Sequence, residues 1–425
     1  MTWDAAQCSD GRVSDAEDVL DSGRPPLPRR VRAAAWVAVA VAAGTLVGLR
    51  EWPRSAPKHH PVAASSSAAQ RVPPPVVLRS WPSAPEACGG YADLPLVSSG
   101  PVTQPTGLGL LVGGPTLSEV DFDSGRAVRL PKVLLRHDEY IAGLVTAAQT
   151  YALTDTCTAS GQAVSRMVRV DAAGQATDVR LPSGAGTVFA DGSRAWSVTY
   201  PDEHHQNASL VLVAGGDSVL LPAGVWPDSM TAGVVMGSTS SGHVVLADAA
   251  TGHLRADLGT GLPLAAGSGL VTWTDGCDLS TIAPCTVHRR SVAGGPVASY
   301  RVPRPPGGSA GVISSDRRLL AFTLERAVQD PRYDQGHPIP PADVAILHLD
   351  TGGLTVIPGI ELPAKMAASL AFSPDGRWLV MALNAGTRTR LLAWREGLSR
   401  AVETQPLAGL VFGPPAFVVQ SRPGA

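Results

Sequence analysis

LAFSPDGRWLVMAL, at residues 370–383, encodes two β-strands joined by a tight turn. Pro374 fixes φ at the start of the turn, and Asp375 and Gly376 complete it, because Gly tolerates the positive φ that tight turns need. The flanking strands carry large apolar side chains that can face a core, namely Phe372, Trp378 and Val380. The segment therefore predicts a β-hairpin that packs against a core.

A second kind of hairpin recurs along the chain as a strand, a tight turn and another strand. Four of its copies place an Asp three or four positions before a Gly, and Asp side chains accept hydrogen bonds from amides two residues on. These residues are Asp121, Asp171, Asp248 and Asp350. The seven copies span 117–131, 167–182, 210–224, 244–259, 286–303, 343–359 and 390–407. Weaker copies of the first hairpin lie at 188–200 and 313–324.

The spacing of these copies predicts the architecture. Their turns recur about every 45 residues, and four-stranded propeller blades take roughly 40–50 residues each. We therefore predict an all-β fold, a seven-bladed β-propeller, in which each blade covers the faces of its neighbours. Six blades, eight blades and a β-sandwich are the structural alternatives.

The pairing of the two hairpin types resembles the repeat of the TolB-like, WD-repeat-like propeller family. The resemblance covers roughly residues 95–412, and the copy at 370–383 is its specific match. It implies a propeller fold and a binding or scaffolding role, and it implies no particular ligand. Because a propeller ring must close, we predict that the final segment, LVFGPPAFVVQ at 410–420, pairs with the first blade.

Residues 33–49, AAAWVAVAVAAGTLVGL, carry no charge and predict one transmembrane helix. At 1.5 Å per residue the segment spans roughly 26 Å, and Trp36 and Trp52 can extend it at the two interfaces. Four arginines before it favour a cytoplasmic N-terminus: Arg24, Arg29, Arg30 and Arg32. We predict an uncleaved signal-anchor, and a cleaved signal peptide is the alternative.

These features divide the chain into four parts. We predict a disordered cytoplasmic tail over 1–32, the signal-anchor helix over 33–49, a Pro/Ala/Ser-rich linker over 50–89 and the propeller domain over 90–425. The composition of the linker favours an extended tether without a core of its own. We thus expect a single-pass protein of the cell membrane with an extracytoplasmic C-terminal domain.

Composition narrows the class of partner. The net formal charge is −2 and only 16% of residues are charged, so the chain lacks the concentrated basic field of a nucleic-acid-binding protein. No motif indicates a cofactor. Four cysteines beyond the apolar segment suit two disulfides in an oxidising compartment. Three pairings are possible, and our hypothesis joins Cys277 to Cys285 and Cys88 to Cys157.

Long segments interrupt four of the repeats between their two hairpins. They lie at 154–163, 201–209, 274–285 and 326–341, and a propeller brings all four to one face around its channel. Two of the segments supply the candidate ligand-binding residues, which are Asp202, His204, His205, Tyr333, Asp334 and His337. Although His binds transition metals, no CxxC or HExxH spacing accompanies these residues, and no metal site is predicted.

The first functional hypothesis is a non-enzymatic module that binds a protein, a peptide or an envelope glycan through this face. The alternative is an extracytoplasmic glycan hydrolase or lyase on the same scaffold, and a third hypothesis is a structural part of a membrane complex. A Gly-x-Ser-x-Gly string lies at 307–311. A nucleophile elbow needs a helix after the Ser, whereas the sequence predicts a strand there, so catalysis is not the main prediction.

Overall fold

A computed structural model of the chain describes residues 76–77 and, with gaps, residues 102–421. The gaps are 103–104, 115–116, 131–138, 158–162, 172–174, 180–184, 201–206, 214, 276, 278–282, 308–310, 327–341, 363–367, 386–387, 405–406 and 409–415. Within the described residues the secondary structure consists of strands, and no helix occurs. The predicted tail and transmembrane helix, and the linker apart from two residues, lie outside this part of the chain.

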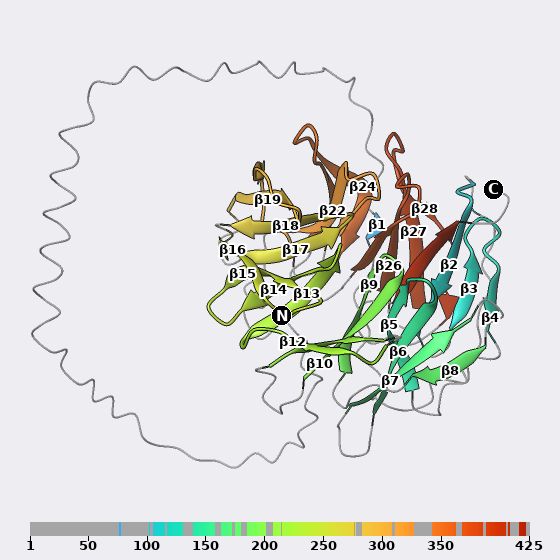
Figure 1. The fold of residues 1–425 in the computed structure, drawn as a ribbon. Helices are drawn as coiled ribbons and strands as arrows, with labels where there is room; N and C mark the ends of the chain where they lie inside the picture. The colour runs from blue at the N-terminus through green and yellow to red at the C-terminus, as the bar shows by residue number, and fades with distance from the viewer. Residues whose placement is uncertain are drawn as a thin grey trace, which may run out of the picture. The chain divides into compact units, whose positions relative to one another are not determined.

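Seven sheets make up the fold, and each is one blade (Figure 1). Within a blade we count strands from the innermost outward. Blade 1 comprises β30 (Phe417–Ser421), β2 (Leu108–Val112), β3 (Ser118–Asp121) and β4 (Ala127–Arg129). Blade 2 comprises β5 (Glu139–Thr146), β6 (Thr150–Cys157), β7 (Ala163–Val170) and β8 (Ala176–Val179). Blade 3 comprises β9 (Ala185–Asp191), β10 (Arg194–Thr199), β11 (Ser209–Leu212) and β12 (Ser218–Leu220).

The remaining four blades follow the same antiparallel order. Blade 4 comprises β13 (Val225–Thr231), β14 (Val234–Thr239), β15 (His243–Asp248) and β16 (Leu254–Thr260). Blade 5 comprises β17 (Leu262–Gly267), β18 (Leu270–Asp275), β19 (Cys285–Ser291) and β20 (Ala298–Val302). Blade 6 comprises β21 (Val312–Ile313), β22 (Leu319–Glu325), β23 (Ala342–His348) and β24 (Leu354–Leu362), and blade 7 comprises β25 (Ala368–Phe372), β26 (Leu379–Ala385), β27 (Arg388–Trp394) and β28 (Val402–Glu403).

Two short strands add to the edges of these sheets. β1 (Val76–Val77) lies parallel to β24, with Val76 opposite Ile360, and β29 (Leu407–Ala408) pairs with β27. β1 falls within the range assigned to the linker, so part of that range extends the edge of blade 6.

Asp residues form the turns between the third and fourth strands as the sequence predicts. Asp121 accepts hydrogen bonds from the amides of Asp123 and Ser124, and Asp248 accepts them from Ala250 and Thr251. Gly residues with positive φ complete these turns, as at Gly125 and Gly252.

The C-terminal strand closes the ring. β30 pairs antiparallel with β2, so that Phe417 lies opposite Val112 and Ser421 opposite Leu108. It is the innermost strand of blade 1 and contacts the innermost strands of both neighbouring blades, β25 and β5. The predicted closure of blade 1 by the last segment of the chain is therefore confirmed, and so is the number of seven blades.

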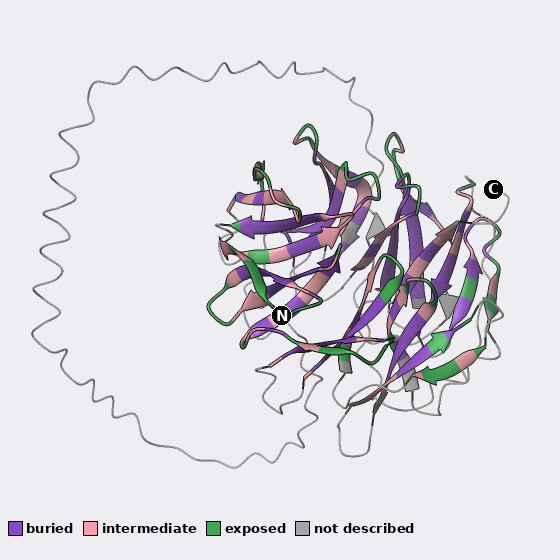
Figure 2. Cartoon of the chain, in the orientation of Figure 1, coloured by how far each residue is buried: buried purple, intermediate pink, exposed green. Residues whose placement is uncertain are grey.

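Buried residues run along the strands of all the blades (Figure 2), and the apolar core of the described residues lies at the seams between adjacent blades. Seven buried clusters occur, and each joins residues of two neighbouring blades. The seam between blades 7 and 1, for example, contains Phe122 and Trp378, which are 0% and 5% exposed. No single sheet shelters its own apolar faces, and each blade needs its neighbours for stability.

Candidate functional site

The strand order places the four long segments on one face of the propeller. Each joins the second strand of a blade to the third, at 158–162, 200–208, 276–284 and 326–341. Because consecutive strands are antiparallel, these connections share a face, which we call the connection face. The turns from first to second strand and from third to fourth strand lie on the opposite face, which we call the turn face. In blade 4 the equivalent connection is only residues 240–242.

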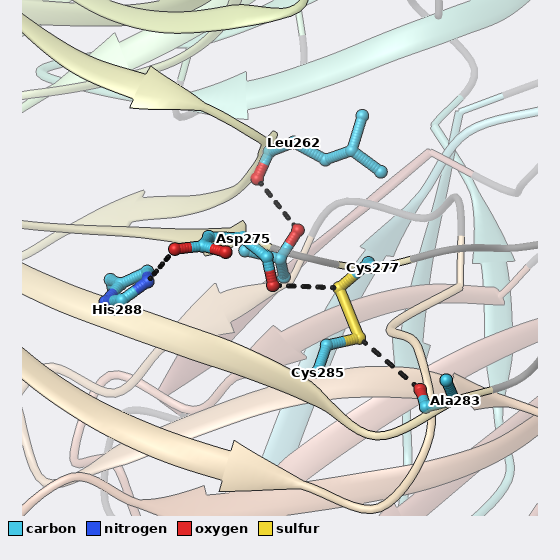
Figure 3. Close-up of a disulfide and its surroundings, with 7 residues drawn as sticks. Leu262, Asp275, Cys277, Ala283, Cys285 and His288 are labelled. Atoms are coloured by element: carbon cyan, nitrogen blue, oxygen red, sulfur yellow. Dashed lines mark hydrogen bonds and ion pairs between the residues drawn. A yellow bond between two sulfur atoms is a disulfide. The ribbon is translucent and has the colours of Figure 1, made fainter. Parts of the chain in front are cut away.

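A disulfide anchors the blade 5 connection. Cys277 and Cys285 are joined (Figure 3), so the structure confirms this predicted pair. Cys285 begins β19 and is buried in the seam with blade 6, whereas Cys277 lies two residues beyond the end of β18. The bond therefore draws the start of the connection onto the core of the blade.

Loss of this disulfide is expected to destabilise the fold moderately. Cys277 and Cys285 are separated by eight residues, and closing a loop of this size contributes about 2–3 kcal/mol in the chain-entropy model. We expect Cys277→Ala/Cys285→Ala to lower the free energy of unfolding by this amount, measured by denaturant titration. Reducing agent should destabilise the parent chain and leave the double variant unchanged, and equal effects on both would contradict the expectation.

Polar cross-strand contacts support the same connection. The ring of His288 stacks on Trp273, with centroids 5.2 Å apart, and its Nε2 lies 3.2 Å from Asp275 Oδ2 (Figure 3). On its other side, His288 Nδ1 lies 2.9 Å from Ser299 Oγ. Ser, His and Asp can form a hydrolytic triad when the Ser bonds Nε2 of the His and the Asp bonds Nδ1. Here the two nitrogens are exchanged, and we interpret the chain of bonds as a brace beside the disulfide.

Two arginines and a buried aspartate anchor the blade 6 connection. Asp343 follows the first residue of β23, and its side chain is 6% exposed. Arg304 Nη2 lies 2.6 Å from Asp343 Oδ2, and Arg326 Nε donates to Asp343 Oδ1 over 2.8 Å. Arg304 precedes β21 and Arg326 is the first residue of the long connection, so one carboxylate joins two segments of the connection face at the seam with blade 5.

Glu325, the last residue of β22, lies on the other side of the blade. It stands opposite Ala342, which belongs to the seam with blade 7, whereas Asp343 stands opposite Leu324 at the seam with blade 5. Glu325 is 6% exposed, and among the described residues its carboxyl group has no hydrogen-bond partner. Burial raises the pKa of this carboxyl to about 7, because charge is costly to bury without a partner.

This group gives the fold a defined pH dependence. The folded chain holds the Glu325 proton up to about pH 7, whereas an unfolded Glu releases it near pH 4.3. The contribution of this group to stability is therefore fully present below the unfolded pKa and is lost as pH rises to about 7, by about 4 kcal/mol in total. Glu325→Gln should flatten this decline and stabilise the chain at pH 8. Unfolding curves from pH 4 to 8 test this, with the exposed Glu119→Gln as control, and an unchanged slope in Glu325→Gln would contradict it.

Polar side chains also lie near the starts of the connections of blades 2 and 3. In blade 2, Ser165 Oγ donates to Asp155 Oδ1 over 2.7 Å across β6 and β7. In blade 3, Tyr200 begins the connection, and burial together with the charge of Asp228 raises the pKa of its hydroxyl. Burial also raises the pKa of Asp228, which accepts a hydrogen bond from Ser238. The first of these bonds lies within blade 2 and the second within blade 4, where the charge of Asp228 acts on Tyr200 at the start of the blade 3 connection.

The candidate ligand-binding residues Asp202, His204, His205, Tyr333, Asp334 and His337 lie outside the described residues. So does Cys88, and nothing is described of the side chain of Cys157 in β6, so the second predicted disulfide remains a prediction. Within the described part of the chain no group of three or more His, Cys, Asp or Glu residues could hold a metal ion. After the string at 307–311 a strand follows, as expected, since β21 begins at Val312.

The charged residues at the ends of the blade 6 connection, Glu325 and Asp343, were not predicted from the sequence. Asp343 begins an apolar strand and Glu325 ends one, and a charged residue at a strand end ordinarily suggests a solvated loop boundary. The one local signal was Arg326, which directly follows Glu325. Arg304 precedes Asp343 by 39 residues, so no local pattern indicated their contact.

No protein-family model matches the chain, and no curated protein matches its sequence. Several solved structures are similar to the chain at low sequence identity. A Bacteroides uniformis protein described as a candidate 6-phosphogluconolactonase has 13% identity and a TM-score of 0.47, covering 74% of this chain and 98% of that one. TolB from Acinetobacter baumannii has 13% identity and a TM-score of 0.38, covering 73% and 66%. An oligogalacturonate lyase in complex with manganese has 11% identity and a TM-score of 0.44, covering 76% and 98%.

The fold and its closure define a seven-bladed β-propeller. This is the architecture that the resemblance to TolB-like propellers implied.

Proposed function

We propose that the chain is a membrane-anchored binding module that recognises a protein, a peptide or an envelope glycan through the connection face. The observation that carries the proposal is the asymmetry of the two faces. Three blades carry extended connections on one side, at 200–208, 276–284 and 326–341, whereas the blade 2 connection is residues 158–162 alone. A disulfide anchors the blade 5 connection, and the ion-paired carboxylate of Asp343 anchors the blade 6 connection. The turn face carries short turns instead. Long connections on rigid supports are where propellers and other scaffolds house recognition.

The anchoring part of the proposal rests on the apolar segment at 33–49 and the arginines before it. No helix in the described part of the chain is long and apolar enough to span a bilayer, and 33–49 lies outside that part. In this proposal the segment is an uncleaved signal-anchor and the propeller is extracytoplasmic. Residues 50–89 hold the propeller away from the bilayer.

Shortening one connection tests the binding role. Blade 4 joins its second and third strands with Ser240, Ser241 and Gly242 alone, so the fold accepts a three-residue connection at this position. We therefore replace residues 327–341 of blade 6 with Ser-Ser-Gly, which retains Arg326 and Asp343. The matched control changes the turn face, with Asp171→Asn in the blade 2 turn, and both variants are checked for an unchanged unfolding transition.

Crosslinking of the full chain in its native envelope, followed by capture, provides the measurement. The proposal expects one partner or glycan that the parent chain and the turn-face control recover equally. The variant with the shortened connection should lose it at least tenfold. Equal recovery by all three proteins would contradict a role for this connection. Turnover of envelope polysaccharide by the purified chain would contradict the non-enzymatic function.

A further inference from the structure

The inner turns of the turn face form a belt of hydrogen bonds. Each of these turns joins the first strand of a blade to the second, and five consecutive seams carry such bonds. The donor–acceptor pairs are Ala148 N to Ser193 O, Ala232 N to Asp191 Oδ1, Gly269 N to Thr231 Oγ1, Ser268 Oγ to Ser314 O and Ser315 Oγ to Pro374 O. The belt therefore runs from blade 2 to blade 7.

The belt stops at the seam between blades 7 and 1. In blade 1 the first strand is β30, near the C-terminus, and the second is β2, near the start of the propeller. These two strands are not consecutive in the chain, so blade 1 has no turn between its first and second strands. A groove of about 340 Å³ lies at this seam. Its lining residues come from the blade 7 turns and from the segment that leads into β2, and they are Pro105–Leu108, Ser373–Asp375, Arg377, Trp378 and Arg395.

Internal hydrogen bonds fix both walls of the groove. On the blade 1 side, Asp123 accepts bonds from the amides of Thr106 and Gly107, over 2.6 and 2.7 Å. On the blade 7 side, Ser373 Oγ accepts a bond of 2.9 Å from the amide of Trp378. The groove is therefore preorganised, and a ligand would not have to order its walls.

Arg395 is a cation without an anionic partner in the described part of the chain. Its guanidinium lies over the ring of Trp378, 4.9 Å from the centroid, and the residue is exposed. Stacking leaves the edge donors of a guanidinium free for a planar anion. The indole N–H of Trp378 also has no acceptor among the described residues, whereas that of Trp394 donates to Leu398 O.

The charges of the groove lining favour a monoanion. Arg377 and Arg395 contribute two positive charges and Asp375 contributes one negative charge, which gives the lining a net charge of about +1 at neutral pH. Arg377 lies 3.7 Å from Asp375, and the Asp123 carboxylate behind the lining is occupied by its bonds from Thr106 and Gly107, so Arg395 is the cation left for a ligand. A carboxylate matches this charge and the planar fork of an arginine. A phosphate monoester carries about −1.5 to −2 at pH 7 and would meet the Asp375 carboxylate.

We propose that the groove between blades 7 and 1 is a second ligand site, on the face opposite the connections, and that it binds a carboxylate group. Arg395, stacked on Trp378, is the principal cation, and Arg377 is the second. The site depends on ring closure because its two walls come from the first and last blades. It is independent of the function proposed for the connection face.

Fluorine NMR of the full chain in detergent micelles tests this proposal. The chain has nine tryptophans, and incorporation of 5-fluorotryptophan gives one resonance for each, with Trp378 assigned from the variant Trp378→Phe. N-acetylglycine and glucuronate are the carboxylate probes and distinguish a peptide source from a sugar source. N-acetylglycinamide is the neutral control, and inorganic phosphate tests the preference for a monoanion.

We expect at least one carboxylate probe to shift the Trp378 resonance saturably, and N-acetylglycinamide to leave it unchanged. Arg395→Gln should weaken the binding at least tenfold and Arg377→Gln should weaken it less. Arg400→Gln should not affect it, because Arg400 is an exposed arginine of the same turn between β27 and β28 and does not line the groove. The absence of a saturable shift, tighter binding of phosphate than of both carboxylates, or an equal loss in Arg400→Gln and Arg395→Gln would overturn the proposal.

Discussion

Removal of β30 by truncation after residue 415 is expected to abolish cooperative unfolding of the propeller. The strand supplies five residue pairs to β2, and Phe417 and Val419 are buried in the seam with blade 7. Without it blade 1 loses its innermost strand and the seam opens, which exposes apolar surface on two blades. Phe417→Ala alone should cost about 3 kcal/mol of a total that is only about 5–15 kcal/mol.

Complementation separates ring closure from a general effect of truncation. A synthetic peptide of residues 411–425 added to the truncated chain should restore a cooperative transition, followed by tryptophan fluorescence. The same peptide with Val419→Asp should not, because it would bury a charge at the seam. A truncated chain that unfolds cooperatively without peptide would contradict the closure described here.

Asp343→Ala is expected to be the most costly single change at the base of the connection face. It removes the shared partner of Arg304 and Arg326, whose side chains are 25% and 35% exposed in the folded chain. Loss of one partner from a buried ion pair costs about 3–5 kcal/mol. The partial exposure of both arginines places the expected loss near 3 kcal/mol, measured by denaturant titration.

Asp350→Ala in the same blade is the matched control. Asp350 pairs with Arg318, and their side chains are 42% and 65% exposed. An exposed pair of this kind contributes far less to stability than a buried one, so Asp350→Ala should cost much less than Asp343→Ala. If the two variants lose the same stability, the Arg304–Asp343–Arg326 network does not anchor the connection.

The ring could be predicted from the sequence because the same kind of hairpin recurs at a regular spacing, with an Asp in the turn of four of the seven copies. Pro374 and Gly376 define the blade 7 hairpin, and the Asp residues of the outer turns bond the amides that their spacing suggests. Trp378 and Val380, expected to face a core, are 5% and 0% exposed. The last strand could be predicted because a closed ring of blades needs a strand from the C-terminal segment to complete the first blade. The same requirement predicted that this strand pairs with blade 1.

Turn patterns and repeat spacing predicted less of the candidate site than of the fold. The positions of the long segments followed from counting strands, and the Cys277–Cys285 pair followed from its position around one of them. The bases of the segments depend on which side of a strand each residue faces, as the alternation of Glu325 and Asp343 between two seams illustrates. The groove between blades 7 and 1 is formed by residues that lie far apart in the sequence. No local sequence pattern predicts such a contact.

Hydroxyl-radical footprinting of the full chain in its native envelope tests most directly whether the connection face is the recognition face. The comparison is between labelling in the envelope and labelling of the purified protein, mapped by mass spectrometry. We expect protection in the envelope at 200–208, 276–284 and 326–341, with unchanged labelling of the turns near 124, 251 and 397 on the opposite face. Equal labelling of the connections in both samples, or protection confined to the turn face, would contradict the account.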